Sequence, residues 1–450
     1  MSRRSGPEPV ATSPGLARAT YFLLQADAAT AISTLATAIV VARGLGPANR
    51  GIFFLALLAA MIIALVGSFG LTTSAMVYAA RPNAPLAQLH WIVAAFSVLA
   101  GVIGTALLLV FSGPLIDSVL GGLDRTMLLT VGLGIAPLLY AQILGAGLTG
   151  LGRVKEISAL RVAAAVVTPL ALVPAVVLTH DPYWAVFAWL LTTIAVAAAT
   201  AVMSFRLLAP PARPPRALVR EIGSFSLRGY IGTLAHQGFL RVDVLFISAR
   251  LGPAAVGLYS QASVLAERIS MLGHAAYGAS AKRLGSDPPD EAAKLTAELV
   301  RKLLLIMAPI ALALAALAHP FMTVLFGARF EPAAEPLQIL LPGTVCLTLW
   351  YIVSLYIVAS LRRPGLTTII QSLALLGALP LYWLAVREWG MNGAAAVSCG
   401  VYVTVLAAGL AVLLRAPTVG PGDLLPGRED VRHVLELLRA GLTRLRPRRG

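Results

Sequence analysis

Leu45–Phe53 read LGPANRGIF and Leu251–Tyr259 read LGPAAVGLY, two copies of one motif that lie 206 residues apart in a chain of 450. Each copy follows a long apolar run and leads into another. A repeat at about half the chain length predicts two structurally similar halves. The alternative is a coincidence in a chain rich in Leu, Gly, Pro and Ala.

The composition excludes a water-soluble globule. Apolar residues make up 58% of the chain, charged residues only 12%, and the mean hydropathy is +0.83. Soluble domains average roughly 45–50% apolar and about 25% charged residues. The chain is therefore expected to be embedded in a membrane.

Long apolar runs set the number of membrane crossings. A crossing helix needs about 20 mainly apolar residues, because each residue advances it by about 1.5 Å across roughly 30 Å of hydrocarbon. Twelve such runs are predicted: 20–42, 52–79, 89–111, 126–149, 157–179, 183–205, 223–249, 254–281, 299–318, 334–361, 365–386 and 392–415.

The Lys and Arg residues give the orientation of these crossings. With twelve spans, 27 of the 35 fall on the side of the N-terminus, six on the other side, and Arg241 and Arg268 within spans. Because Lys and Arg gather in cytoplasmic loops, both termini are expected to be cytoplasmic. We therefore expect a multi-pass protein of the cytoplasmic (inner) membrane.

The runs and their connections predict five regions along the chain. They are a disordered cytoplasmic tail (1–19), a first six-helix bundle (20–206), a Pro- and Arg-rich linker (207–222), a second bundle (223–415), and a C-terminal region with a basic amphipathic helix (416–450). Six crossings return the chain to the same side, so the halves would be parallel repeats. The predicted fold class is an all-α polytopic membrane protein with twelve transmembrane helices in two parallel six-helix bundles.

Several motifs resemble one family of exporters. Ala42–Pro47 (ARGLGP), followed by Gly67–Leu71 (GSFGL), is similar to the opening of Wzx-type polysaccharide flippases of the MATE-like MOP exporter superfamily. Arg241–Ile247 and Gly257–Ala262 resemble the start of the family's second half. The stretches Leu325–Phe330 and Gly390–Ala395 resemble its patterns before the tenth and twelfth spans.

This resemblance implies a two-lobed exporter that works by alternating access. It would move an undecaprenyl-diphosphate-linked oligosaccharide from the inner to the outer leaflet, for the assembly of cell-surface polysaccharide. The implied partners are the lipid-linked substrate, the lipid bilayer, and a polysaccharide polymerase or other assembly proteins.

Ionisable side chains at membrane depth are the candidate site. They cost several kcal/mol unless they face a cavity or a partner, so their presence predicts function. Three spans carry them; the candidate cavity residues are Asp27 and Thr34 in the first span, His236, Gln237, Arg241 and Asp243 in the seventh, and Glu267 and Arg268 in the eighth.

The residue types suggest roles in holding a sugar diphosphate. An Arg guanidinium can pair two phosphate oxygens at once. Asp27, Asp243 and Glu267 would bind sugar hydroxyls or a coupling cation. The alternative is that Arg241 with Asp243, or Glu267 with Arg268, form buried pairs that only fix helix packing.

Other functions are less well supported by the sequence. There is no catalytic dyad, metal-ligand cluster or phosphate-binding glycine loop, so neither an enzyme nor a cofactor is expected. Nucleic-acid-binding proteins typically carry a basic patch interleaved with aromatic residues. The sequence has no such patch, so no nucleic-acid partner is expected. The alternatives are an exporter of small amphipathic cations with the same fold, or a membrane polysaccharide polymerase or ligase, although the longest outer segment, 112–125, is too short for a domain.

Overall fold

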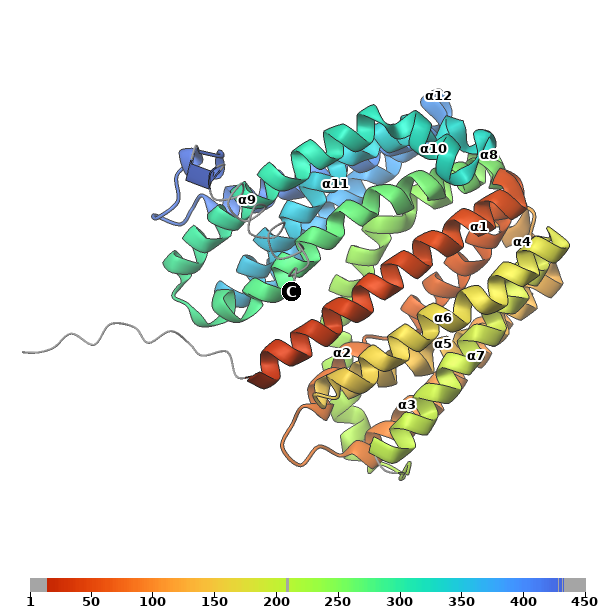
Figure 1. Cartoon of the computed structure of the whole chain (residues 1–450). Helices are drawn as coiled ribbons and strands as arrows, with labels where there is room; N and C mark the ends of the chain where they lie inside the picture. The colour runs from red at the N-terminus through yellow and green to blue at the C-terminus, as the bar shows by residue number, and fades with distance from the viewer. Residues whose placement is uncertain (1–13, 208–209, 428, 431, 433–450) are drawn as a thin grey trace, which may run out of the picture. The chain divides into compact units, whose positions relative to one another are not determined.

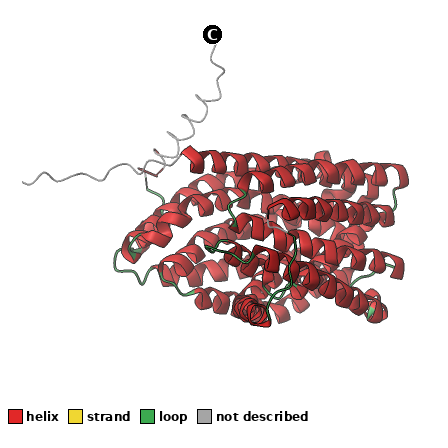
Figure 2. Ribbon diagram, turned by 90° about the horizontal axis from the view of Figure 1, so that it is seen from below, coloured by secondary structure: helices red, strands yellow, loops and turns green. Residues whose placement is uncertain are grey.

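The computed structural model describes residues 14–207, 210–427, 429–430 and 432; side chains are described from Ala29 onward, apart from single positions within helices. In this part of the chain every regular element is a helix and no strand occurs (Figure 2). Most of the predicted N-terminal tail and most of the predicted C-terminal amphipathic helix lie outside the described residues.

The described residues contain nine helices long and apolar enough to cross a membrane. They are α1 (Pro14–Gly67), α3 (Leu86–Val110), α5 (Arg125–Gly150), α6 (Val154–Thr179), α7 (Pro182–Leu207), α8 (Arg216–Ser286), α9 (Pro289–Ala316), α11 (Ala334–Leu355, with flanking turns) and α12 (Pro364–Leu413). The shorter helices are α2 (Leu71–Ala79), α4 (Ser112–Ser118), α10 (Ala318–Phe326), η1 (Ala328–Ala333), η2 (Tyr356–Ser360) and η3 (Pro421–Leu424). The expected all-α, multi-pass membrane protein is confirmed.

Three of the long helices are broken at a glycine. Gly46 in α1 and Gly252 in α8 have φ values of 71° and 77°, and Gly390 in α12 has 57°. Only glycine adopts such angles without steric cost. Each arm of a broken helix corresponds to one predicted span. The six unbroken long helices and the six arms of the broken ones together match the twelve predicted spans. The number of actual crossings stays a prediction.

The breaks in α1 and α8 fall within the repeated motif, at its second residue. Pro174 in α6 and Pro380 in α12 are also 206 residues apart and lie inside their helices. A proline inside a helix removes one backbone hydrogen bond and permits a kink. The repeat read from the sequence therefore recurs as equivalent backbone features in the two halves.

The residues pack into two compact units. The first contains the described residues up to Gly44, with Ala56–Ser112 and Asp124–Gly229; the second contains Leu45–Leu55, Gly113–Leu123 and the described residues from Tyr230 onward. The units thus cut across the predicted domain limits, because two short segments from the first half pack with the second. The domain limits themselves stay a prediction.

In the first unit, α5 is the central helix. It packs against α2, α3, α6 and α7. Small residues allow these close approaches: a Cβ on Gly132 of α5 would clash with Thr105 of α3, and one on Gly134 would clash with Trp189 of α7. Small residues at helix contacts are typical of membrane proteins, where van der Waals packing rather than the hydrophobic effect holds helices together.

In the second unit, α11 has the equivalent place. It packs against α9 and α12 (Figure 1), and its Trp350 is fully buried. Gly343 of α11 lies against Cys399 of α12, and Gly409 of α12 against Trp350. Since α5 and α11 correspond to the fourth predicted span of each half, this equivalence also supports the repeat.

The two copies of the repeated motif touch each other within the second unit. A Cβ on Gly51 would overlap the carbonyl group of Pro253, and a Cβ on Gly257 would overlap the carbonyl group of Pro47. The contact is reciprocal, as expected for a pair of related helix arms that cross around a local two-fold axis. The second glycine of each motif therefore permits backbone contact, while the first permits the break.

Substitution of Gly257 by Ala is expected to destabilise the protein by about 1–3 kcal/mol, because the methyl group overlaps backbone that cannot move aside. Thermal unfolding in detergent would measure this loss. Gly278→Ala is the control, since a Cβ at Gly278 of the same helix meets no described atom within 4 Å. Equal stability of the two variants would show that the crossing is loose.

A polar cluster joins α2 to the start of α8 within the first unit. The Tyr78 hydroxyl donates to Glu221 at 2.8 Å, and the Arg81 guanidinium donates to the same carboxylate at 3.0 Å and stacks on the Tyr78 ring. Nearby, the hydroxyls of Ser74 and Ser226 lie 2.6 Å apart. The hydrogen bond from Arg81, and then that from Tyr78, lower the pKa of Glu221 below its ordinary value of 4.5.

The cluster should weaken in acid. A carboxylate with a lowered pKa in the folded state stabilises the fold above its unfolded pKa and loses that contribution as the pH falls through its folded pKa. The thermal midpoint of the wild type should therefore fall more between pH 6 and pH 3 than that of Glu221→Gln. Parallel curves for the two proteins would mean that the ion pair does not contribute.

Candidate functional site

The second unit encloses a cavity of about 320 Å³ with an ionic lining. Helix α8 provides most of the lining, α11 provides four residues and the second arm of α12 provides one. The polar and aromatic residues that line it are His236, Arg241, Asp243, Ser263, Glu267, Arg268, Ser270, His274, Thr344, Tyr351 and Tyr402. Five of the eight predicted site residues therefore line this one cavity: His236, Arg241, Asp243, Glu267 and Arg268.

The strongest contact in the cavity is an ion pair between the two arms of α8. Arg241 Nη1 lies 2.6 Å from Glu267 Oε1, and Nη2 lies 3.2 Å from Oε2. The two residues are 26 positions apart, and they meet because α8 breaks at Gly252. The side chain of Arg241 is 25% exposed and that of Glu267 is 44% exposed, so the pair borders the cavity.

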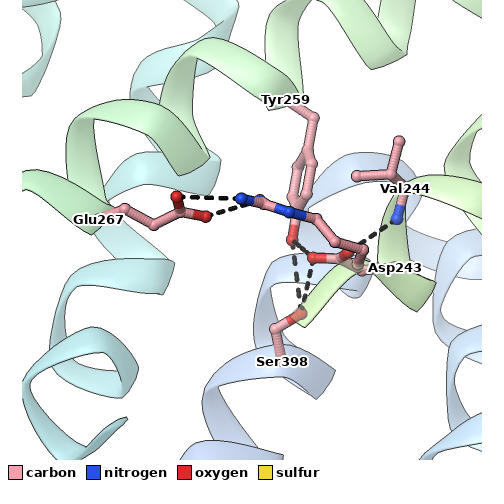
Figure 3. Close-up of polar contacts among 6 residues, drawn as sticks. Asp243, Val244, Tyr259, Glu267 and Ser398 are labelled. Atoms are coloured by element: carbon pink, nitrogen blue, oxygen red, sulfur yellow. Dashed lines mark hydrogen bonds and ion pairs between the residues drawn. The ribbon is translucent and has the colours of Figure 1, made fainter. Parts of the chain in front are cut away.

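Asp243 lies two residues after Arg241 but has a different environment. It is almost fully buried, and Tyr259 and Ser398 point toward its carboxylate (Figure 3). The Tyr259 hydroxyl donates to Oδ2 at 2.7 Å, Ser398 donates to Oδ2 at 3.2 Å, and the backbone N–H of Val244 donates to Oδ1 at 2.8 Å. Three donors hold this carboxylate in place.

Two histidines and a tyrosine continue the cavity on its other side. The rings of His236 and His274 lie 6.0 Å and 5.0 Å from that of Tyr351. His236 Nδ1 lies 2.9 Å from the Gln371 side-chain nitrogen. An adjoining pocket of about 300 Å³ is lined by the same three aromatic residues and Gln371. The polar surface therefore extends past the ion pair.

Arg268 adds a second guanidinium to the lining. It is half-buried, and its Nε atom is buried without a hydrogen-bond partner among the described residues. The formal charges of Arg241 and Arg268 in the cavity lining balance those of Asp243 and Glu267. An anion that entered would meet Arg268 directly, and it would meet Arg241 only in competition with Glu267.

The structure pairs the ions differently from the packing alternative. In that alternative Arg241 pairs with Asp243, or Glu267 pairs with its neighbour Arg268. The observed ion pair is Arg241 with Glu267. Neighbours on a helix point in different directions, whereas residues on two facing arms can meet, and only the break at Gly252 creates those arms.

The other predicted residues lie elsewhere or cannot be placed. Gln237 is half-buried and does not line the cavity. Thr34 belongs to the first unit, where its hydroxyl donates to the carbonyl of Thr30 one turn earlier in α1. Asp27 is in α1, but its side chain lies outside the described part. For these residues a role in the site stays a prediction.

Sequence reasoning missed the tyrosines of the site. Tyr351 and Tyr402 line the cavity, and Tyr259 and Tyr382 are buried beside Asp243, where Tyr382 lies 2.9 Å from Ser398. Tyrosine side chains are neutral, so they do not stand out in an apolar span as charged residues do. The available signal was Tyr259 itself, which stands inside the repeated motif.

Comparisons with known proteins agree with this fold. The lipid II flippase MurJ in an inward closed conformation has a TM-score of 0.70 at 15% identity, over 94% of this chain and 91% of that chain. A variant of the Vibrio cholerae MATE transporter VcmN has 0.60 at 15% identity, over 89% and 97%. A MOP superfamily transporter from Pyrococcus furiosus has 0.55 at 18% identity, over 89% and 94%. The protein thus has the fold of MATE and MurJ transporters.

The family model described as polysaccharide biosynthesis protein matches residues 40–335. The chain belongs to this family, and the resemblance drawn from its motifs is confirmed. No curated protein sequence gave a match.

The coupling between Arg241 and Glu267 can be measured directly. A double-mutant cycle with Arg241→Ala and Glu267→Ala is expected to give a coupling free energy of about 1 kcal/mol in thermal unfolding, since the pair is partly exposed to the cavity. Strictly additive effects would show that the ion pair does not contribute to stability. A parallel cycle with Arg283 near the end of α8 and Asp287 just after it, a pair outside the cavity lining, serves as the reference.

Proposed function

We propose that this protein moves a lipid-linked oligosaccharide from the inner to the outer leaflet of the cytoplasmic membrane by alternating access. The observation that supports this most is the cavity of the second unit, where Arg241 and Arg268 lie at predicted membrane depth. Intramembrane charges around a cavity mark a path for a polar substrate. Membership of a polysaccharide biosynthesis family supports a lipid-linked sugar as that substrate.

The ion pair suggests how a diphosphate headgroup is held. The guanidinium of Arg241 has a bidentate acceptor in Glu267, and a diphosphate offers the same pair of oxygens with more charge. Glu267 is the more exposed partner, so it can turn toward the cavity when an anion takes its place. In this proposal Glu267 neutralises Arg241 while the site is empty and then accepts hydrogen bonds from sugar hydroxyls.

Asp243 contributes in another way. Its three donors leave its carboxylate little freedom to rotate, and burial keeps it from water. We assign it a positioning role: its negative charge, two residues from Arg241, favours the charged guanidinium and fixes the first arm of α8 against Tyr259 and Ser398.

The orientation follows from the distribution of positive charge. Both termini are proposed to be cytoplasmic, since most Lys and Arg residues fall on that side of the predicted spans. The flipped headgroup would then be delivered to the side where polymerases and other assembly proteins use it.

A small-cation exporter is the competing function. Glu267, Tyr351 and Tyr402 line the cavity together, and aromatic faces with a carboxylate suit an organic cation. In that case Arg241 would oppose binding, whereas in the proposed function Arg241 is required. The effect of removing Arg241 therefore separates the two functions.

Arg241→Ala is expected to insert normally in the membrane and to lose most of the transport of lipid-linked sugar, because the diphosphate loses its bidentate partner. Accessibility of the sugar at the outer leaflet would be measured in cells that depend on this protein for export. Arg283→Ala, on an exposed part of the same helix, is the control and should transport as the wild type does.

Normal sugar export by a well-inserted Arg241→Ala variant would contradict the proposal. Increased efflux of an organic cation by that variant, without sugar export by the wild type, would favour the cation exporter instead.

A further inference from the structure

A pocket of about 300 Å³ adjoins the ionic cavity around Arg241 and Glu267, and it differs from that cavity in charge. Its described lining contains two histidines, three larger aromatic side chains, two hydroxyls, one amide and one valine. No carboxylate, lysine or arginine is among these lining residues, so we call it the neutral pocket. An ion that left water to enter it would have no counter-charge there, whereas an uncharged polar ligand would avoid that cost.

Two hydrogen bonds determine where the histidines of the neutral pocket carry their protons. The side-chain nitrogen of Gln371 donates to His236 Nδ1 at 2.9 Å, so this nitrogen has no proton and the ring is neutral. His274 Nδ1 donates to the carbonyl oxygen of Ser270 at 3.0 Å, so Nε2 is the acceptor of the neutral ring. Gln371 is itself almost fully buried, which holds its amide in one orientation.

The neutral pocket is rich in hydrogen-bond acceptors. The hydroxyl of Ser354 donates to the carbonyl of Tyr351 at 2.9 Å, and that of Thr367 donates to the carbonyl of Pro364 at 2.7 Å. Each hydroxyl proton is thus used by the backbone, and each oxygen is left to accept. The side-chain oxygen of Gln371 is a further acceptor. Such a lining suits a ligand that donates several hydrogen bonds without carrying charge, as the hydroxyl groups of a sugar do.

The aromatic faces and the size of the neutral pocket favour a single sugar ring. The Tyr351 ring lies 6.0 Å from that of His236 and 5.0 Å from that of His274, and Tyr277 in the same lining is 39% exposed. One face of a pyranose consists of C–H groups, which pack well on aromatic rings. Small-molecule sites span roughly 300–1,000 Å³, so this pocket suits one sugar rather than an oligosaccharide.

The neutral pocket lies on the predicted cytoplasmic side of the ion pair. The first arm of α8 runs outward and reaches His236 before Arg241; the second arm runs back and reaches His274 after Glu267. Thr367 is in the first turn of α12, beside a predicted cytoplasmic loop. A lipid-linked sugar has its parts in the order tail, diphosphate, sugar. With its diphosphate at Arg241, a substrate from the inner leaflet would place its first sugar in the neutral pocket.

We propose that the neutral pocket binds the first sugar of the lipid-linked substrate and that this sugar is uncharged. The inference rests on the proposed function and deepens it by naming the class of sugar. A sugar carboxylate would be buried here without a cation, since Arg241 and Arg268 line the ionic cavity instead. An organic cation would find no carboxylate. Gln371 is the specificity residue, because its amide orients His236 and offers the ligand an acceptor.

Matched lipids would test the class of sugar. The full-length protein in phospholipid nanodiscs would be titrated with polyprenyl diphosphate and with the same lipid carrying glucose, glucuronate, galactose or galacturonate, and native mass spectrometry would give the affinities. Glucose or galactose is expected to raise the affinity about tenfold over polyprenyl diphosphate, the effect of one or two net hydrogen bonds. The two acids should raise it little. Acids that bind as tightly as their neutral partners, or no gain with either neutral sugar, would overturn the proposal.

Substitution of Gln371 tests the pocket itself. Gln371→Leu is expected to lose the gain from the neutral sugar and to keep the affinity for polyprenyl diphosphate, which also shows that the variant is folded. Gln338→Leu is the matched control, because the Gln338 side chain donates to the carbonyl of Ala315 and lines neither cavity. It should retain the gain. An undiminished gain in Gln371→Leu would overturn the proposal.

An added cation should reverse the preference. Thr367→Arg places a guanidinium in the neutral pocket and is expected to bind the glucuronate or galacturonate lipid more tightly than its neutral partner. Thr418→Arg, outside both cavities, is the control and should keep the wild-type preference. An unchanged preference in a Thr367→Arg variant that still binds polyprenyl diphosphate would overturn the proposal.

These experiments separate this inference from the proposed function. Discrimination between neutral and acidic sugars by a protein that exports no sugar would refute the flippase function and retain the sugar pocket. Export of lipid-linked sugar by the wild type, with no discrimination in binding and no effect of Gln371→Leu, would refute the pocket and retain the function.

Discussion

The ion pair between Arg241 and Glu267 depends on one backbone feature, the break of α8 at Gly252. Without the break, residues 26 positions apart on one helix would be about 39 Å apart. The left-handed angle at Gly252 turns the chain so that the two arms face each other, and each charged group acquires a partner at predicted membrane depth. The site thus follows from the same motif that defines the repeat.

The repeated motif has a second consequence. The glycine six positions after Leu45, and its equivalent after Leu251, let the arms approach until backbone meets backbone. In a membrane such contact replaces the hydrophobic effect as the source of helix association. One short motif therefore provides a turn, a crossing point and, through Tyr259 at its end, a donor for the carboxylate of Asp243.

The sequence was sufficient for the fold class, because long apolar runs are a physical constraint on every crossing helix. It placed loops where the structure has helices broken at Gly46, Gly252 and Gly390. It also identified the ionisable residues of the cavity, since their cost at membrane depth makes each one conspicuous. It could not give their pairing. Arg241 with Asp243 and Glu267 with Arg268 are close in sequence, but the partner of Arg241 is fixed by how α8 folds back on itself. The tyrosines were missed for a related reason. A neutral phenol costs much less than a charged group in an apolar span, so the sequence alone does not mark it as part of a site.

The two carboxylates near Arg241 illustrate why burial and pairing must be considered together. Asp243 is enclosed by three donors, so its charge is a fixed part of the structure and any change there would disturb Tyr259 and Ser398. Glu267 pairs with Arg241 and has nearly half of its side chain exposed, so it is the counter-charge that the proposed function lets an anion displace. In the proposed function, a site that captures and then releases an anion needs both properties: an arginine held in position, and a counter-charge that gives way to the ligand and returns after release. In this chain the break at Gly252 supplies them on the two arms of a single helix.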